Sequence, residues 1–130
     1  MLSREKDTLC GVWTLFSGSD STPAGVTKEV RAWRMPEESA ATLEVSAVGY
    51  EKNNRNAASY KRRATFFRKT GDATQVGTTT DVETTETAGV TSWDVTITKS
   101  GATLSVSLVG GSDPIAWVVE VRLLLARRDP

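Results

Sequence analysis

Carboxylates are the side chains in this sequence whose type and spacing could support catalysis. Glycoside hydrolysis needs two carboxyl groups held together in a cleft, one as an acid and the other as a base or nucleophile. The acids here occupy polar, loop-like stretches, which is typical of solvated surface. The sequence therefore predicts a protein that is not an enzyme. The acids considered as pairs are Glu37, Glu38, Asp72, Asp81, Glu83 and Glu86.

The composition excludes several other kinds of site. There is no histidine, so triads and metal sites that depend on imidazole are absent. Cys10 is the single cysteine, which rules out an internal disulfide and a zinc site made of several cysteines. We expect Cys10 to be a small buried hydrophobic residue. No phosphate-binding glycine motif and no calcium-loop motif occurs, and we expect no metal and no cofactor.

The charged residues are balanced overall but segregated along the chain. Lysine plus arginine and aspartate plus glutamate each number 16, so the formal net charge is zero. Proteins dedicated to nucleic acids usually have a basic excess, and we expect no nucleic-acid partner. Residues 51–69 nevertheless carry seven bases and one acid, whereas residues 70–94 carry five acids and no base.

Three interpretations of this segregation stay open. Adjacent strands could pair opposite charges across a sheet, at roughly 0.2–1 kcal/mol per pair. The charges could instead form complementary patches that set the register between subunits or against an acidic partner. DNA binding through residues 61–63 is a third interpretation. The charged residues that we take as candidate interface positions are Lys61, Arg63, Asp81, Glu83 and Glu86.

Large aromatic residues supply further candidates. Trp93 and Trp117 each begin an alternating apolar face, which predicts that both lie in the core. Trp13 and Trp33 lie in less regular segments, where a tryptophan can be a core residue, an interface anchor or a platform for stacking a sugar. With Phe67 from the basic segment, these two complete the set of candidate interface residues.

Alternation of apolar and polar residues indicates strands throughout the chain. The inward positions that we predict for the second half are Trp93, Val95, Ile97, Leu104, Val106, Leu108, Trp117, Val119 and Val121. Residues 17–25 are dense in turn formers and are predicted to be a loop, and residues 78–88 could be an exposed strand or a long loop. Apolar residues on the second face of the last strand, Val118 and Leu124, suggest that this strand is central or covered on both sides.

Strands at about ten-residue spacing, joined by glycine and proline turns, are typical of an antiparallel β-sandwich or barrel. We therefore predict an all-β protein with one domain over residues 11–126, a polar arm at 1–10 and a tail at 127–130. The charged N-terminus lacks the apolar core of a signal peptide, and no segment reaches the roughly 18 apolar residues of a membrane helix. We expect a protein made in the host cytoplasm, without a membrane partner.

The order of strands in the second half resembles a small β-domain of tailed-bacteriophage virion proteins. An aromatic and basic strand at 60–68 is followed by a glycine turn and a Thr-Gln-Val-Gly segment at 71–77. A Trp-Asp-Val-Thr strand at 93–96, a Leu-x-Val strand at 104–106 and an Ile-Ala-Trp-Val-Val-Glu-Val strand at 115–121 complete the resemblance. It covers about half of the chain.

The resemblance implies a non-enzymatic structural protein of the virion, which binds and bridges other virion subunits. In such proteins the module usually ends a longer chain, whereas here it lies in a chain of 130 residues. A capsid decoration or cement protein is therefore the first expectation, and a small tail or head-to-tail component is the alternative. The implied partners are the major capsid protein or tail subunits and further copies of the same chain. A carbohydrate-binding module in host recognition is the rival from another class, and it would use Trp13 or Trp33.

Overall fold

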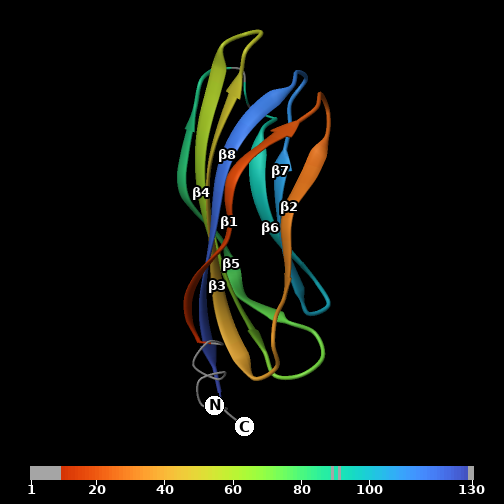
Figure 1. Cartoon of the computed structure of the whole chain (residues 1–130), viewed down its shortest axis with the longest axis vertical. Helices are drawn as coiled ribbons and strands as arrows, with labels where there is room; N and C mark the ends of the chain where they lie inside the picture. The colour runs from red at the N-terminus through yellow and green to blue at the C-terminus, as the bar shows by residue number, and fades with distance from the viewer. Residues whose placement is uncertain (1–9, 89, 91, 129–130) are drawn as a thin grey trace.

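Strands make up about three quarters of the part of the chain that the computed structural model describes, which comprises residues 10–88, 90 and 92–128. Figure 1 shows them as an elongated body of two layers. The strands are β1 (Gly11–Thr22), β2 (Thr27–Arg34), β3 (Ser39–Glu51), β4 (Asn56–Arg68), β5 (Thr74–Glu86), β6 (Asp94–Ser100), β7 (Thr103–Val109) and β8 (Ile115–Arg127). The predicted all-β, single-domain fold is confirmed.

The eight strands form two antiparallel sheets. The larger sheet has the order β1-β8-β3-β4-β5, and the smaller has the order β2-β7-β6. Of the two architectures left open by the sequence, the described strands adopt the sandwich, with the two sheets face to face (Figure 1). Within residues 10–88, 90 and 92–128, no helix is long and apolar enough to cross a membrane.

The core lies between the sheets and follows the predicted alternation. All nine inward positions predicted for the second half are buried. Tyr60, Ala64 and Phe66 of β4 point inward as well, with at most 2% of each residue exposed. The rings of Trp93 and Trp117 lie 5.9 Å apart between centroids and are tilted against each other. Period-two patterning therefore located the core correctly, because each inward position carries an apolar side chain.

The last strand is central, as predicted, but it is covered on one side only. β8 lies between β1 and β3 in the larger sheet. Its outward residues Val118 and Leu124 are 64% and 49% exposed, so of the two possibilities that the sequence left open, a central position holds and cover on both faces does not. A second apolar face on a strand can mark a surface that is open to a partner, as well as one that is buried within the domain.

The N-terminal strand is longer than the sequence predicts. Residues 17–22, assigned to a loop from their composition, continue β1 and pair with β8 as far as Thr22 opposite Ile115. A bulge between Thr14 and Phe16 shifts the register, so Trp13 and Phe16 both pack against the core. Pairing with a long neighbouring strand overrides the turn preference of serine and glycine here, because β8 supplies partners for the backbone groups along one side of β1.

The segment left open between strand and loop is an edge strand. β5 pairs with β4 along one side, and register shifts interrupt the pairing twice. Gly77, with a φ of 71°, lies near the second of these shifts, where a left-handed residue suits a bulge. Twelve of the thirteen residues of β5 are exposed, so its polar composition reflects an edge that contributes little to the core.

The ends of the domain meet at the start of β1. The half-buried thiol of Cys10 donates a hydrogen bond to the Arg127 carbonyl at 3.5 Å, which makes Cys10 less buried than predicted. β8 reaches Arg127, the first residue of the predicted tail. The remainder of the predicted arm, residues 1–9, and residues 129–130 lie outside the described residues.

A close backbone approach inside the larger sheet provides a test of this packing. A Cβ atom at Gly49 would lie 2.9 Å from Cζ3 of the buried Trp117 ring, whereas one at Gly18 would meet ordinary contacts at 3.8 Å. We expect Gly49→Ala to lower the free energy of unfolding by about 1–3 kcal/mol, as overpacking does in a filled core. Gly18→Ala is the matched control. Urea denaturation measures both, and equal stability of the two variants would contradict this account of the core.

Candidate binding groove

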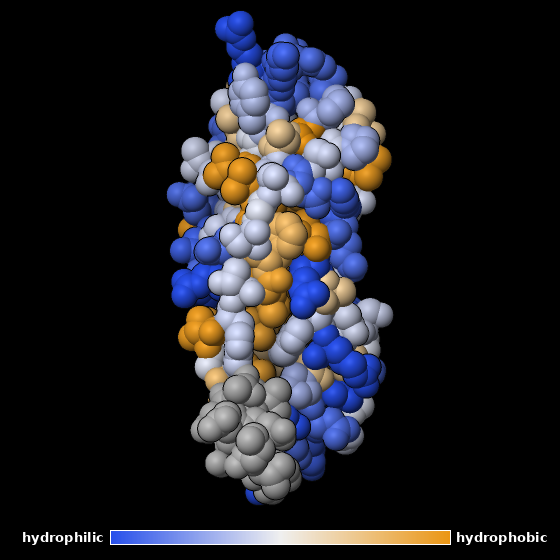
Figure 2. All heavy atoms as spheres, viewed as in Figure 1, coloured by the Kyte–Doolittle hydropathy of each residue, from blue (hydrophilic) through white to orange (hydrophobic). Residues whose placement is uncertain are grey.

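The sandwich is open along the side where β1 and β2 face each other. A groove of about 360 Å³ lies at this opening. Figure 2 shows the opening as an apolar strip that runs along the molecule between polar flanks. The groove is lined by Trp13, Thr14, Leu15, Arg31, Trp33, Arg34, Pro36, Leu123 and Leu125. The two edge strands thus leave part of the core accessible from solvent.

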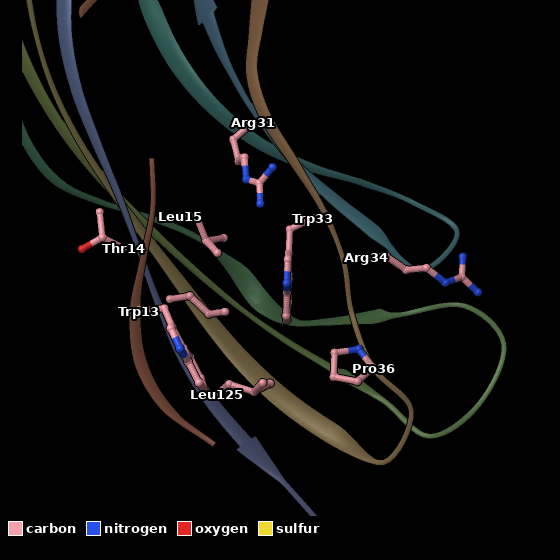
Figure 3. Close-up of a pocket in the computed structure, with 9 residues that line it drawn as sticks. Trp13, Thr14, Leu15, Arg31, Trp33, Arg34, Pro36 and Leu125 are labelled. Atoms are coloured by element: carbon pink, nitrogen blue, oxygen red, sulfur yellow. The ribbon is translucent and has the colours of Figure 1, made fainter. Parts of the chain in front are cut away.

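Two tryptophans predicted as separate candidates come together in this groove. Trp13 lies opposite Leu123 in the pairing of β1 with β8, and Trp33 lies opposite Leu104 in the pairing of β2 with β7. Both tryptophans are half-buried and pack against the core cluster. Figure 3 shows them on the two sides of the opening, Trp13 from β1 and Trp33 from β2. Each is therefore partly a core residue and partly a wall of the groove.

Arginine is the other notable component of the groove. Arg31 and Arg34 line it and are exposed, and neither forms an ion pair within the described part of the chain. In Figure 3 the guanidinium of Arg31 extends toward Trp33, whereas that of Arg34 points away from the tryptophans. The lining residues include no acid. Aromatic faces beside unpaired guanidinium groups suit a ligand that combines an apolar face with an anionic group.

Sequence reasoning missed the arginines of the groove. Arg31 and Trp33 are two residues apart on β2, which places both side chains on the same face of the strand. That spacing could have drawn attention to Arg31 once Trp33 was a candidate. The meeting of Trp13 with Trp33 could not have been found in the same way, because it depends on which edges of the two sheets face each other.

Opposite charges pair across adjacent strands at the other side of the sandwich. Nη1 of Arg62 lies 2.7 Å from Oδ1 of Asp81 on β5, and Nη2 lies 3.2 Å from Oδ1 of Asp94 on β6. The guanidinium also lies 5.0 Å from the centroid of the Tyr60 ring. Arg62 thereby connects the two sheets and closes the side away from the groove. These contacts support cross-strand pairing for Arg62, whereas Lys61 and Arg63 pair with Glu44 on β3 and not with the acidic segment.

The remaining acidic candidates also have partners within the domain. Glu83 accepts a hydrogen bond from the Ser59 hydroxyl at 3.2 Å, and Glu86 accepts one from the Tyr60 hydroxyl at 2.5 Å. Burial raises the pKa of Tyr60 well above its usual value, and the adjacent Glu86 carboxylate adds to the shift. These acids therefore hold β5 against β4, a structural role that their sequence positions alone did not specify.

The basic candidates and Phe67 lie on the outer surface of the larger sheet. Lys61 and Arg63 flank Glu44 at 3.6 Å and 2.9 Å, and Phe67 is 46% exposed near one end of the sheet.

Of the acids considered as catalytic pairs, Glu37 accepts a hydrogen bond from the Thr70 hydroxyl at 3.1 Å. Among the described residues, no group of three or more cysteine, aspartate or glutamate side chains is placed to hold a metal ion.

Comparisons with known proteins concern the fold. No protein-family model matches the sequence, and no curated protein matches it. The tailspike protein of Acinetobacter baumannii phage AM24 aligns with a TM-score of 0.52 and 13% identity, over 87% of this chain and 26% of the tailspike. The tailspike gp49 of A. baumannii bacteriophage Fri1, a capsular polysaccharide depolymerase, aligns over 97% of this chain and 23% of the tailspike, at 11% identity and a TM-score of 0.42. This chain thus spans about a quarter of the length of the tailspikes it matches.

The likeness to the AM24 tailspike corrects the prediction that the protein is not an enzyme. That prediction took the domain to belong to virion proteins without a catalytic role, whereas the fold aligns with part of a phage tailspike and leaves the enzyme status open. Hydrolysis of glycosidic bonds uses a pair of carboxylates and does not require histidine. Neither the fold nor the absence of histidine therefore excludes an enzyme.

The charges on the outer surface predict a response to acid. Hydrogen bonding from Arg63, reinforced by Lys61, holds the pKa of Glu44 below its ordinary value of 4.5. Because the folded state binds this proton less readily than the unfolded state, its contribution to stability is present above pH 4.5 and is lost as the pH falls through the folded-state pKa. Partly exposed ion pairs contribute roughly 0.2–1 kcal/mol.

Between pH 6 and about pH 3, we therefore expect the free energy of unfolding to fall by roughly 0.2–1 kcal/mol less in Glu44→Gln than in the wild type. The part of the fall that is due to other carboxylates should be the same in both proteins. Urea denaturation at a series of pH values measures the difference between wild type and variant. Parallel stability profiles for the two proteins would show that Glu44 contributes nothing through its ionisation.

Proposed function

We propose that this protein is a tail-associated component of a bacteriophage virion. The observation that supports the proposal is the sandwich fold, which aligns over 87% of the chain with part of the AM24 phage tailspike. The order of strand motifs in the second half, which lies largely within the aligned part, also resembles virion domains. The likeness is to a tail protein, so we favour a tail component over a capsid decoration protein. Its partners would be other tail subunits and further copies of the chain.

The location can be tested in purified particles of the phage that encodes the chain. Heads and tails are separated on a density gradient, and the protein is quantified in each fraction by mass spectrometry. We expect it in the tail fraction at a fixed ratio to the tail subunits. Recovery with heads would support capsid decoration in its place, and absence from both fractions would contradict a virion role altogether.

The groove favours a second function, binding of a saccharide chain. Trp13 and Trp33 present indole surface on the two sides of one opening, and the groove lining contains two arginines and no acid. Sugar rings bind to proteins by stacking their apolar faces on aromatic rings, while hydroxyl and carboxylate groups take hydrogen bonds from polar side chains. Arg31 extends toward Trp33 and is placed to supply such bonds (Figure 3).

The two arginines of the groove are expected to favour acidic saccharides over neutral ones. An acidic polysaccharide would place its carboxylates near Arg31 and Arg34, which have no anionic partner among the described residues. Guanidinium–carboxylate bonds are stronger than those between neutral groups and are often bidentate. We therefore expect acidic chains to bind more tightly than neutral ones, and added salt to weaken the binding.

Tryptophan variants test the groove directly. Binding is measured on an array of acidic and neutral bacterial polysaccharides and then by intrinsic fluorescence titration. We expect Trp33→Ala to weaken binding by about thirtyfold, corresponding to about 2 kcal/mol for an aromatic anchor. Because Trp33 also packs against the core, Arg31→Ala is a second variant that removes an exposed side chain and leaves the packing intact.

The control for these variants is Val26→Ala, which trims an apolar residue that is 39% exposed, lies between β1 and β2 and does not line the groove. It is expected to bind like the wild type. If the wild type binds no saccharide on the array, the groove does not bind glycans. Unchanged binding in both the Trp33→Ala and Arg31→Ala variants would contradict the proposal as well.

A further inference from the structure

The outer face of the five-stranded sheet, defined as the outward residues of β1, β8, β3, β4 and β5, is unusually apolar. Side chains alternate along each strand, so this face shares no residue with the core. Seven large apolar residues on it are between 46% and 64% exposed. They are Val12, Val48, Tyr50, Phe67, Val76, Val118 and Leu124. Large exposed apolar side chains gathered on one face commonly mark a contact with another protein.

The strand register arranges this face into three bands that cross the strands. At one end Leu124 lies opposite Val12 and Thr42, and the neighbouring row places Ala40 between Ala126 and Phe67. This is the first apolar band.

At the other end of the sheet the second apolar band has a complementary shape. Val48 lies opposite Val118, and the next row places Tyr50 between Ala116 and Ala57. The two bands thus each contain one row with a single large aromatic residue beside small alanines.

The middle band is charged and electrically neutral. One row contains Arg122, Glu44 and Arg63, and the adjacent row contains Glu120, Lys61 and Glu83. Glu44 is paired with both Lys61 and Arg63 within the chain. Within the described residues, Glu120 and Arg122 form no ion pair and are exposed, two residues apart on the central strand β8.

We propose that this outer face is the contact between two copies of the chain, related by a two-fold axis. The axis lies in the contact plane, perpendicular to the strands, and passes between the rows of Arg122 and Glu120. Rotation about it places Arg122 opposite the Glu120 of the second copy and Glu120 opposite its Arg122. Reciprocal pairs of this kind are the signature of an isologous contact.

The same rotation matches the apolar bands by size. Tyr50 falls on the Ala40 of the second copy, and Phe67 falls on its Ala57. On the central strand, Val118 falls on the second copy's Leu124. A large side chain therefore meets a small one on β3 and again on β4, which lets two sheets pack without voids. Lys61 meets the second copy's Arg63, a like-charge contact that two acids of each chain offset: Glu44, which is paired with both bases, and Glu83, which lies opposite Lys61.

The size of the face is adequate for a stable dimer. Eleven residue positions along β3 and five strands across cover about 35 Å by about 20 Å, on the order of 700 Å² per copy. Standard protein contacts bury about 800 Å² per partner. The zero net charge of the chain adds no overall repulsion between copies. The inference does not depend on the proposed tail location or on the ligand of the groove.

Charge reversal and charge exchange on β8 test the contact. Sedimentation velocity of the purified full chain should show a dimer at micromolar concentration. Arg122→Glu should weaken the dimer by roughly a hundredfold, because it places like charges opposite each other twice. The double variant Glu120→Arg/Arg122→Glu restores opposite charges across the axis, and its dimer should approach wild-type affinity.

Two further variants keep the test specific. Val118→Asp, at a residue that is 64% exposed, should abolish the dimer while leaving the melting temperature of the monomer unchanged. Arg34→Glu reverses an exposed arginine of the groove and should leave the dimer intact. The proposal is overturned if the wild type stays monomeric at high micromolar concentration, or if the double charge exchange fails to recover the dimer lost in Arg122→Glu.

Discussion

The buried indole of Trp117 is the contact on which the rest of the sandwich depends. It lies on the central strand of the larger sheet and donates a hydrogen bond from Nε1 to the Thr22 hydroxyl of β1 at 3.0 Å. Its ring has room because Gly49 on β3 has no side chain, and it is in contact distance of the Tyr60 and Trp93 rings. One side chain thus connects β1, β3 and β4 with the segment that leads into β6. A buried N–H without this partner would cost about 1–3 kcal/mol, so the polar residue at 22 belongs to the core as much as the aromatic ring does.

The arrangement around this core makes the two sides of the sandwich unequal. On the β4–β6 side, Arg62 bonds to Asp81 and Asp94 and closes the gap between the sheets. On the β1–β2 side the corresponding gap is left to Trp13 and Trp33, which are half-buried and line a groove. The segregation of charge along the sequence therefore has a structural explanation. The basic strand β4 and the acidic strand β5 are neighbours joined by the Arg62–Asp81 ion pair, and the aromatic side is the accessible one.

Sequence patterns predicted the parts of the fold where side chains decide the structure. The alternation from Trp93 to Val121 identified the core because every inward position there is apolar. It failed for residues 17–22, where serine, glycine and aspartate form a strand because β8 offers a partner for their backbone. For the binding surfaces, the sequence identified individual residues but not which of them lie together in the fold. Trp13 and Trp33 were found as candidates, but their meeting depends on the facing edges of two sheets. Asp81 and Glu86 seemed available in the sequence, yet the fold engages them with Arg62 and Tyr60.

The groove and the outer face occupy different surfaces, which has a consequence for binding if the protein pairs through the outer face. The proposed two-fold axis runs across the strands, so each strand of one copy lies over the same strand of the other. The β1 edges of both copies then fall on one side of the dimer, and both grooves open in the same direction. A repetitive polymer such as a polysaccharide could engage the two grooves together. Binding of the second groove then becomes intramolecular, which can raise the overall avidity by about 10²–10⁴ over a single groove when the spacing fits. Separate surfaces for self-association and for ligand would thus let modest contacts at each groove combine into firm attachment.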